Sequence, residues 1–262
     1  MGWKGIAIGG YIGSIFGGPL GSILGAALGH KVESMAFGGD NRRPGYAEMP
    51  PGGRSMIFCA SVAAMMAKLA KADGAVTRDE IDGVEEAFRR LGFTPSARRY
   101  AVNVFRKAKD DSHSIYEYAR EFAGAVSSVE VRELFYEILW DIACVDGAVS
   151  EEELVILQRI PRSLGIRPGL FDYFFVRRIG SRRAGAPPPP PRDPLADAYA
   201  MLGAKPSDGA DTLRRKYREL AKRNHPDALR AQGLPDEMVG KATERMSRIN
   251  SAWAAIKEAR NI

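Results

Sequence analysis

The stretch LRRKYRELAKRNHPD, residues 213–227, decides how the C-terminal part of the chain folds. Its apolar positions recur at helical spacing and most of its other positions are Lys or Arg, which is typical of an amphipathic helix with a basic outer face. Pro226 ends this helix, because proline lacks an amide hydrogen and disfavours the helical conformation in the residue before it. The pattern predicts a basic helix from Asp208 to Arg223, capped by Ser207 and followed by a tight loop.

Two further helices flank this one in the sequence. Pro194 begins a short apolar helix that Gly203 closes. A third helix is expected from about Pro235, with one apolar side. That side carries Met238, Met246, Ile249, Trp253 and Ile256. Residues 194–262 are therefore predicted to form a helical hairpin that presents residues 225–227 at one end.

Taken in order, the segments Tyr199–Gly203, Leu213–Ala221, His225–Asp227 and Met246–Trp253 resemble a J domain throughout its length. The resemblance implies that the protein is no enzyme and needs no cofactor, but recruits a DnaK-type chaperone and accelerates its ATP hydrolysis. In that family the His-Pro-Asp loop contacts the chaperone near its nucleotide-binding domain. The residues that the resemblance assigns to this contact are His225, Pro226 and Asp227, with Arg214, Arg215, Arg218 and Lys222 as a basic face toward an acidic patch.

The N-terminal residues 5–29 carry no charged side chain, and as a helix they would extend about 37 Å, enough to cross a bilayer. Glycine recurs there at every fourth position, which makes a stripe without side chains through which two helices can approach closely in lipid. The stripe includes Gly9, Gly13, Gly17, Gly21 and Gly25. We predict that residues 1–30 are a glycine-zipper transmembrane anchor that pairs the chain into a homodimer. A flexible tail is the alternative, because glycine disfavours helix in water.

Charges around the predicted anchor indicate its orientation. Basic residues follow the anchor at Lys31, Arg42, Arg43 and Arg54, whereas only Lys4 and the amino terminus precede it. This asymmetry predicts that the rest of the chain lies in the cytoplasm. Residues 31–54 are rich in Gly and Pro and are predicted to be a tether.

Residues 55–180 show helical spacing of apolar residues and contain an internal repeat, in which Ala72–Ile81 is echoed by Val145–Leu154. In each copy a helix is expected to end near Asp-Gly, and Thr77 or Ser150 to cap the next one. A Glu three residues after each cap completes a capping box. The pattern predicts a duplicated helical unit.

Asp73 and Asp146 of the repeat allow a second interpretation, a site for a divalent cation. Capping is favoured, because the acidic residues lie where helix dipoles already attract them, and no bound metal is expected. The Asp-Gly repeat resembles the TerB-like domain family, whose members are associated with stress responses and often with membranes. Residues 181–193 contain five consecutive prolines and are predicted to be a semi-rigid linker.

Composition excludes several classes of protein. The 262 residues include only two cysteines, Cys59 and Cys144, and three widely separated histidines. A disulfide scaffold and a cysteine-built zinc site are therefore excluded, and a histidine-built metalloenzyme is disfavoured. The net charge of +6 allows polyanion binding, but the basic helix lacks interleaved aromatic residues, so no nucleic-acid partner is expected.

The chain as a whole is predicted to be all-α and resembles the membrane-anchored DnaJ-like co-chaperones. The resemblance implies a single-pass protein of the bacterial inner membrane that brings a DnaK-type chaperone to that membrane. The alternative is a stress-response or envelope-signalling scaffold in which the TerB-like domain is the main effector.

Overall fold

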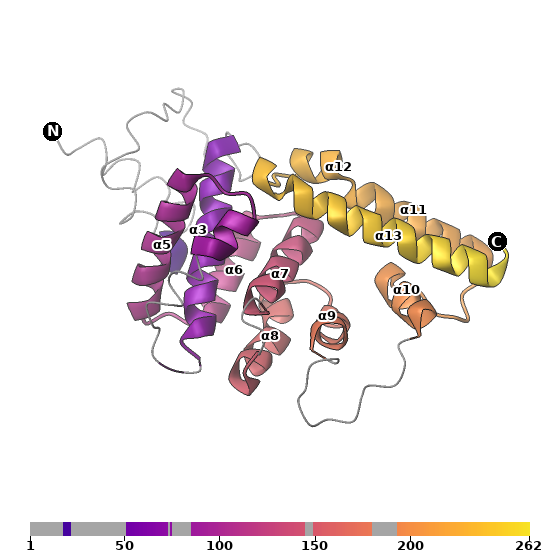
Figure 1. Cartoon of the computed structure of the whole chain (residues 1–262), viewed down its shortest axis with the longest axis horizontal. Helices are drawn as coiled ribbons and strands as arrows, with labels where there is room; N and C mark the ends of the chain where they lie inside the picture. Colours follow the sequence, from indigo (N-terminus) through magenta and orange to yellow (C-terminus); the bar gives the residue numbers. More distant parts are fainter. Residues whose placement is uncertain (1–17, 22–50, 73, 75–84, 145–148, 180–192) are drawn as a thin grey trace.

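The structure is a computed structural model that describes residues 18–21, 51–72, 74, 85–144, 149–179 and 193–262. The regular elements in these residues are all helices, which confirms the prediction of an all-α protein. They form two parts (Figure 1): a helical bundle within residues 51–179, and a C-terminal unit within residues 193–262.

The bundle is arranged around one buried helix. Its helices are α3 (Pro51–Ala70), α5 (Pro95–Asp110), α6 (Ile115–Ala125), α7 (Val129–Ala143), α8 (Glu151–Leu164) and α9 (Leu170–Arg178). Helix α3 packs against α5, α6, α7 and α8 (Figure 1). Residues 57–67 of α3 are all buried, because small or apolar residues surround this helix on every side.

Aromatic rings fill the space between the bundle helices. The Phe58 ring of α3 lies edge-on to Phe135 of α7, with 5.3 Å between centroids, and Phe135 stacks on Phe122 of α6 at 4.0 Å. Toward α9, Trp140 and Tyr136 of α7 lie within about 6 Å of Phe174. Helix α7 thus connects both aromatic groups of the core.

A polar cap marks the start of helix α8. The Ser150 hydroxyl accepts a hydrogen bond from the amide of Glu153 at 3.1 Å, and the Glu153 carboxylate accepts one from the amide of Ser150 at 2.9 Å. This reciprocal pair is the capping box predicted for the second copy of the repeat. Thr77, the predicted cap of the first copy, lies outside the described residues.

The C-terminal unit is a hairpin with a short helix against it. Its elements are α10 (Pro194–Leu202), α11 (Ala210–Asn224), α12 (Pro226–Ala231), the 3-10 turn η3 (Asp236–Met238) and α13 (Val239–Arg260). Helices α10 and α11 both pack against α13, and Leu213, Ile249 and Ile256 are fully buried between them. Helix α13 begins at Val239 rather than Pro235, because η3 occupies the residues between.

The start of α11 also differs from the prediction. Gly209 is its N-cap and Ala210 its first residue, so the predicted cap Ser207 and first residue Asp208 lie before the helix. The Asp208 carboxylate instead accepts a hydrogen bond from the Lys216 ammonium at 2.8 Å. This contact ties the loop before α11 to the second turn of the helix.

One end of the C-terminal unit joins the core of the bundle. Leu229, Leu234, Met238 and Ala242 are buried and belong to the same apolar cluster as the bundle helices. The other end of the hairpin, which carries the C-terminus, points away from the bundle (Figure 1). The second apolar cluster, between α10, α11 and α13, stabilises that far end.

Residues 18–21 are the described part of the predicted anchor, and they lie on α6. The Glu121 carboxylate accepts hydrogen bonds from the amides of Gly18 at 3.1 Å, Leu20 at 2.6 Å and Gly21 at 3.2 Å. Burial outweighs these hydrogen bonds and raises the pKa of Glu121. Leu20 is fully buried in the bundle core. Within the described residues, no helix has the length and apolarity that crossing a membrane requires.

Candidate functional site

The predicted His-Pro-Asp site lies at the corner between α11 and α12. His225 follows the last residue of α11 and is also the N-cap of α12. Its Nδ1 accepts a hydrogen bond from the Asp227 amide at 3.3 Å. Pro226 is the first residue of α12, where a missing amide hydrogen costs no helical hydrogen bond. The predicted loop is therefore a direct junction between two helices.

The corner is open to solvent on its outer side. The His225 side chain is 54% exposed and the Asp227 side chain 81% exposed, with 3.7 Å between His225 Nδ1 and Asp227 Oδ2. A carboxylate in this position is accessible to a cationic side chain of another protein. The two polar side chains of the site therefore face outward together.

Buried residues on either side fix the corner. Asn224, the last residue of α11, is fully buried, and its side-chain amide donates a hydrogen bond to the Leu220 carbonyl at 2.9 Å. Leu229 of α12 is fully buried in the bundle core. Asn224 was not among the predicted site residues; its only sequence signal is an amide side chain directly before the His-Pro-Asp triplet.

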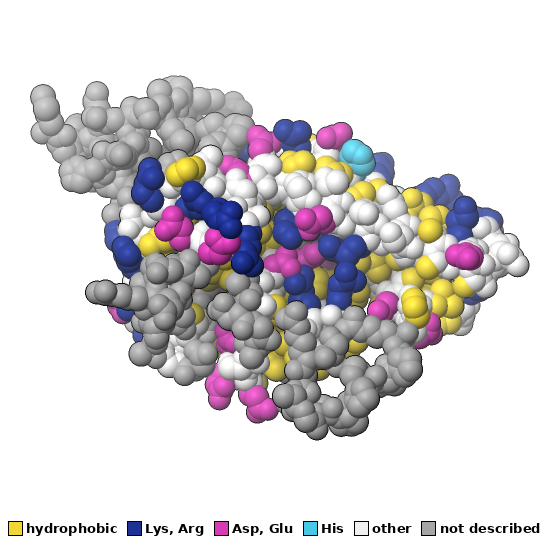
Figure 2. All heavy atoms as spheres, viewed as in Figure 1, with side chains coloured by type: hydrophobic (Ala, Val, Ile, Leu, Met, Phe, Trp, Pro, Cys, Tyr) yellow, Lys and Arg dark blue, Asp and Glu magenta, His cyan; other side chains and the backbone are white. Residues whose placement is uncertain are grey.

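The predicted basic face lies along the exposed side of α11. Its members Arg214, Arg215, Arg218 and Lys222 are all exposed. Three of them are spaced four residues apart, so they follow one another along the helix toward the corner. Lys and Arg side chains are visible over the C-terminal hairpin in Figure 2. The Arg214 guanidinium pairs with Asp211 of the first turn at 3.1 Å, and Arg218 donates to the Arg214 carbonyl at 3.3 Å.

Lys216 has a different role from the exposed basic residues of α11. Its ammonium donates hydrogen bonds to the Gly203 carbonyl and to the Asp208 carboxylate, both at 2.8 Å. The hydrogen bond from Lys216 lowers the pKa of Asp208, and the Lys205 amide adds to this effect. Lys216 thus holds the loop between α10 and α11.

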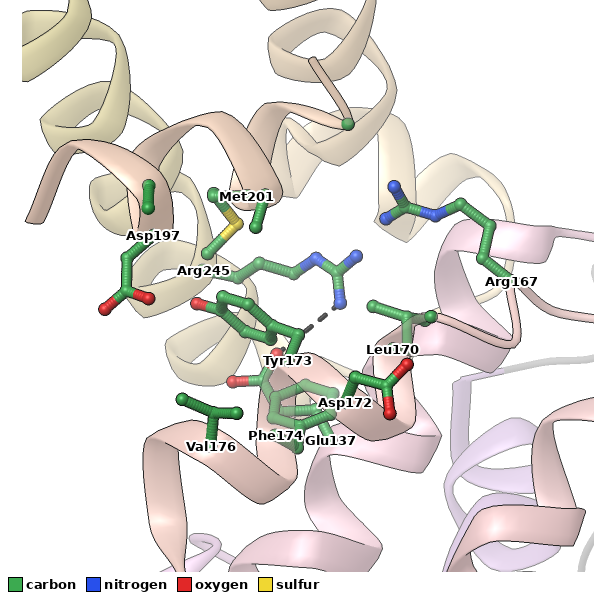
Figure 3. A pocket seen from close by; sticks show the side chains of 14 residues that line it. Glu137, Arg167, Leu170, Asp172, Tyr173, Phe174, Val176, Asp197, Met201 and Arg245 are labelled. Carbon is green, nitrogen blue, oxygen red and sulfur yellow. Dashed lines mark hydrogen bonds and ion pairs between the residues drawn. The ribbon is translucent and has the colours of Figure 1, made fainter. Parts of the chain in front are cut away.

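A cavity of about 480 Å³ lies between α9 and α10, where the bundle meets the C-terminal unit (Figure 3). Its apolar wall includes Leu170, Tyr173, Phe174, Val176 and Met201. Arg245 of α13 reaches into this space between the two parts, with Glu137 of α7 beside it (Figure 3). Sequence reasoning did not find the cavity, because its walls come from helices far apart in the chain.

The other predicted site residues fall mostly outside the described part of the chain. Gly21 is described and contacts Glu121, whereas Gly9, Gly13, Gly17 and Gly25 are not. Asp73 and Asp146, the alternative cation ligands, also lie outside it. Across the described ranges, no group of three or more His, Cys, Asp or Glu side chains is placed to hold a metal ion.

Comparison with known proteins gives a match to the TerB family model and matches to several co-chaperones. Residues 60–173 match the family model described as tellurite resistance protein TerB. The Co-chaperone protein DjlA of Escherichia coli is 32% identical over 217 residues, which is 78% of this chain and 80% of that protein. DjlA of Photobacterium profundum is 31% identical over 74% of the chain, and DjlA of Yersinia pseudotuberculosis 29% identical over 87%. The match covers 75% of the Photobacterium profundum protein and 87% of the Yersinia pseudotuberculosis protein. No solved structure matches the chain significantly.

Proposed function

Because the chain belongs to the DjlA family of co-chaperones, we propose that its C-terminal unit is a J domain that recruits a DnaK-type chaperone and accelerates its ATP hydrolysis. One observation carries the proposal. The residues His225, Pro226 and Asp227 form an exposed corner at the end of a basic helix, and buried residues on both sides fix that corner. The protein then acts on the nucleotide cycle of its partner.

Each residue of the corner has a separate task in this proposal. Pro226 sets the angle at which α12 leaves α11, because its ring fixes the backbone φ angle. The His225 Nδ1 accepts a hydrogen bond from the Asp227 amide, which holds the imidazole ring at the start of α12. The Asp227 carboxylate pairs with an arginine of the chaperone.

The exposed face of α11 guides the encounter. Arg214, Arg215, Arg218 and Lys222 form a positive surface leading to the corner, and an acidic patch on the chaperone complements it. Charges of this kind raise the association rate and fix the register of the two proteins. Pro226 and Asp227 are then brought to the chaperone in the correct orientation.

The bundle and the N-terminal segment determine where this happens. In our proposal residues 1–30 anchor the chain in the bacterial inner membrane, with the bundle and the J domain in the cytoplasm. The glycine stripe of residues 9–25 pairs two anchors into a homodimer. A span through residues 5–29 requires Gly18–Gly21 to leave Glu121, so the contact with α6 and insertion into lipid exclude one another.

The proposal is tested with the substitution His225→Gln in the full chain. Gln is polar but lacks the ring nitrogen that accepts the hydrogen bond from the Asp227 amide. The variant should therefore stimulate ATP turnover of a purified DnaK-type chaperone about tenfold less or weaker still. His113→Gln is the matched control, because His113 is a half-exposed histidine of the bundle and should leave stimulation unchanged.

Circular dichroism of both variants shows whether they retain their helices. Full stimulation by the folded His225→Gln variant would contradict the proposed mechanism. Stimulation absent even from the unaltered chain would favour the scaffold function instead.

A further inference from the structure

Helices α7 and α13 carry opposite charges on the faces that meet. Glu133, Glu137 and Asp141 are spaced four residues apart on α7, and therefore lie on one face of that helix. Lys241, Arg245 and Arg248 lie on one face of α13. The two rows contact each other across the boundary between the bundle and the C-terminal unit.

Arg245 is the centre of these contacts. Its side chain is 5% exposed, with Nη2 at 2.5 Å from Glu133 Oε2 and Nη1 at 3.4 Å from Glu137 Oε2. Arg248 of α13 donates to the other oxygen of Glu137, and Arg167 donates from the bundle to the other oxygen of Glu133 at 2.9 Å. Both carboxylates are buried, and each is shared by two arginines.

Apolar contacts and further hydrogen bonds accompany the ion pairs. Leu229, Leu234, Met238 and Ala242 bury their side chains in the bundle core. The Ser128 hydroxyl donates to the Gln232 side chain at 2.5 Å, and the Ser55 hydroxyl donates to Glu237 at 2.5 Å. The contact therefore combines buried apolar side chains and hydrogen bonds with the ion pairs, as stable interfaces do.

Buried ion pairs of this kind specify orientation more than they add stability. Burial removes hydration from each charge, and the attraction between partners does little more than offset that loss. A shifted or rotated arrangement would leave a buried carboxylate without its arginine, which is strongly unfavourable. In the observed arrangement Arg245 pairs with Glu133 and Glu137 at the same time.

We infer that the acidic face of α7 is a docking surface for the C-terminal unit, and that it holds this unit on the bundle in one fixed orientation. The docked face consists of η3, α12 and the first half of α13. The exposed side of α11 and the corner at His225 stay uncovered. Where the proposed function holds, the bundle thus presents the chaperone-binding surface outward instead of shielding it.

A cysteine pair reports the docked state in the full chain. Ser128→Cys with Gln232→Cys replaces two side chains that touch across the boundary. Mild oxidation should join them into an intramolecular disulfide, seen as faster migration on a non-reducing gel. The Ser128→Cys single variant is the control for disulfides with Cys59 or Cys144. Because Cys is shorter than Gln, a double variant without a disulfide is treated again with a short bifunctional thiol reagent. Failure to form either the disulfide or this cross-link would overturn the inference.

Charge variants test whether the ion pairs cause the orientation. In the double-cysteine background, Arg245→Glu should slow disulfide formation about tenfold or more, because it places a third carboxylate beside Glu133 and Glu137. The matched control is Arg214→Glu, the same change at an exposed position of α11, which should leave the rate unaltered. Adding Glu133→Arg to Arg245→Glu exchanges one pair and should restore part of the rate.

Circular dichroism identifies any variant that has lost its helices. An unchanged rate in the folded Arg245→Glu variant would overturn the role of the ion pairs. Equal slowing by Arg214→Glu would overturn it as well, because the effect would then be one of net charge.

The disulfide-joined protein also allows the docking of the two parts to be tested separately from the proposed function. The disulfide-joined protein should stimulate the chaperone as well as its reduced form does, because the corner and α11 are uncovered in the docked state. Stimulation that appears only after reduction would overturn the outward orientation. Where neither form stimulates, the proposed function fails, while the disulfide experiment still decides whether the two parts dock.

Discussion

The Tyr217 ring of α11 lies parallel to the Trp253 ring of α13, with 5.0 Å between centroids and 8° between planes. The Tyr217 hydroxyl also donates a hydrogen bond to the Asn250 side chain at 3.2 Å. Both rings are only partly buried and pack against the apolar cluster of the C-terminal unit. They join the two long helices of the hairpin on the side that the bundle does not cover.

Replacing this stacked pair should weaken the hairpin. Trp253→Ala removes the stacking and the apolar area of the indole, and should lower the free energy of unfolding of the C-terminal unit by about 1–3 kcal/mol. Trp253→Phe keeps an aromatic ring opposite Tyr217 and should lower the free energy of unfolding by less. Urea unfolding followed by circular dichroism measures both, and equal stability of the alanine variant and the unaltered chain would contradict the role of the stack.

Charge reversal on α11 should slow binding of the chaperone. Arg214→Glu with Arg218→Glu inverts the centre of the exposed basic face, so the association rate should fall about tenfold or more at low salt and less at high salt. Surface plasmon resonance with an immobilised DnaK-type chaperone measures the rate. Arg99→Glu, an exposed arginine of α5, is the control. A decrease in the association rate that is equal at low and high salt would argue against steering by charge.

Asp208 should make the stability of the C-terminal unit depend on pH. Its pKa is lowered in the folded chain, chiefly by Lys216, so its ionised form stabilises the fold above about pH 4. That contribution is lost as the pH falls through the folded-state pKa. Asp208→Asn should therefore lower the melting temperature at pH 7 and lower it less at about pH 2.

Thermal unfolding at both pH values measures this difference. Asp211→Asn is the control, because the Asp211 side chain is 98% exposed. If Asp208→Asn lowers the melting temperature equally at both pH values, the loss of stability is caused by packing and not by charge.

Glu121 should compete with the membrane for the N-terminal segment. Glu121→Ala removes the acceptor for three backbone amides of Gly18–Gly21, so a larger share of the chain should sediment with lipid vesicles. Glu121→Gln keeps one carbonyl oxygen and should give a smaller increase. An unchanged or reduced bound share in the alanine variant would mean that the contact with α6 does not oppose insertion.

The glycine stripe should control pairing of the anchors. Gly13→Leu, Gly17→Leu and Gly21→Leu together add side chains to the stripe, so the share of dimer in detergent should fall while membrane insertion persists. Ala27→Leu, off the stripe, is the control. Chemical cross-linking measures the dimer, and equal dimer content in both variants would exclude close packing of backbones as its cause.

Much of the C-terminal unit could be predicted because its signals are local. Pro226 and the periodic apolar residues of α11 fix where that helix ends and which side faces inward. The start of α11 was predicted wrongly. Asp208 is not its first residue but lies in the preceding loop, where its carboxylate accepts a hydrogen bond from Lys216 of the helix. Helix ends of this kind depend on a competition between partners that a sequence pattern does not rank.

The docking surface could not be predicted in the same way. Glu133, Glu137 and Asp141 form a visible acidic row on a largely apolar helix, but the sequence does not say what faces it. Arg245 lies more than a hundred residues away along the chain. The capping box at Ser150, which needs only neighbouring residues, was predicted correctly.

The sequence alone determined the helical class, the order of the helices and the identity of the residues at the corner, because periodicity, proline and capping act over a few residues. Tertiary structure alone decided that the acidic row of α7 meets Arg245 and Arg248, and that the corner at His225 faces outward. The reason is physical: a buried charge is stable only beside its partner, and which partner reaches it depends on how distant helices pack.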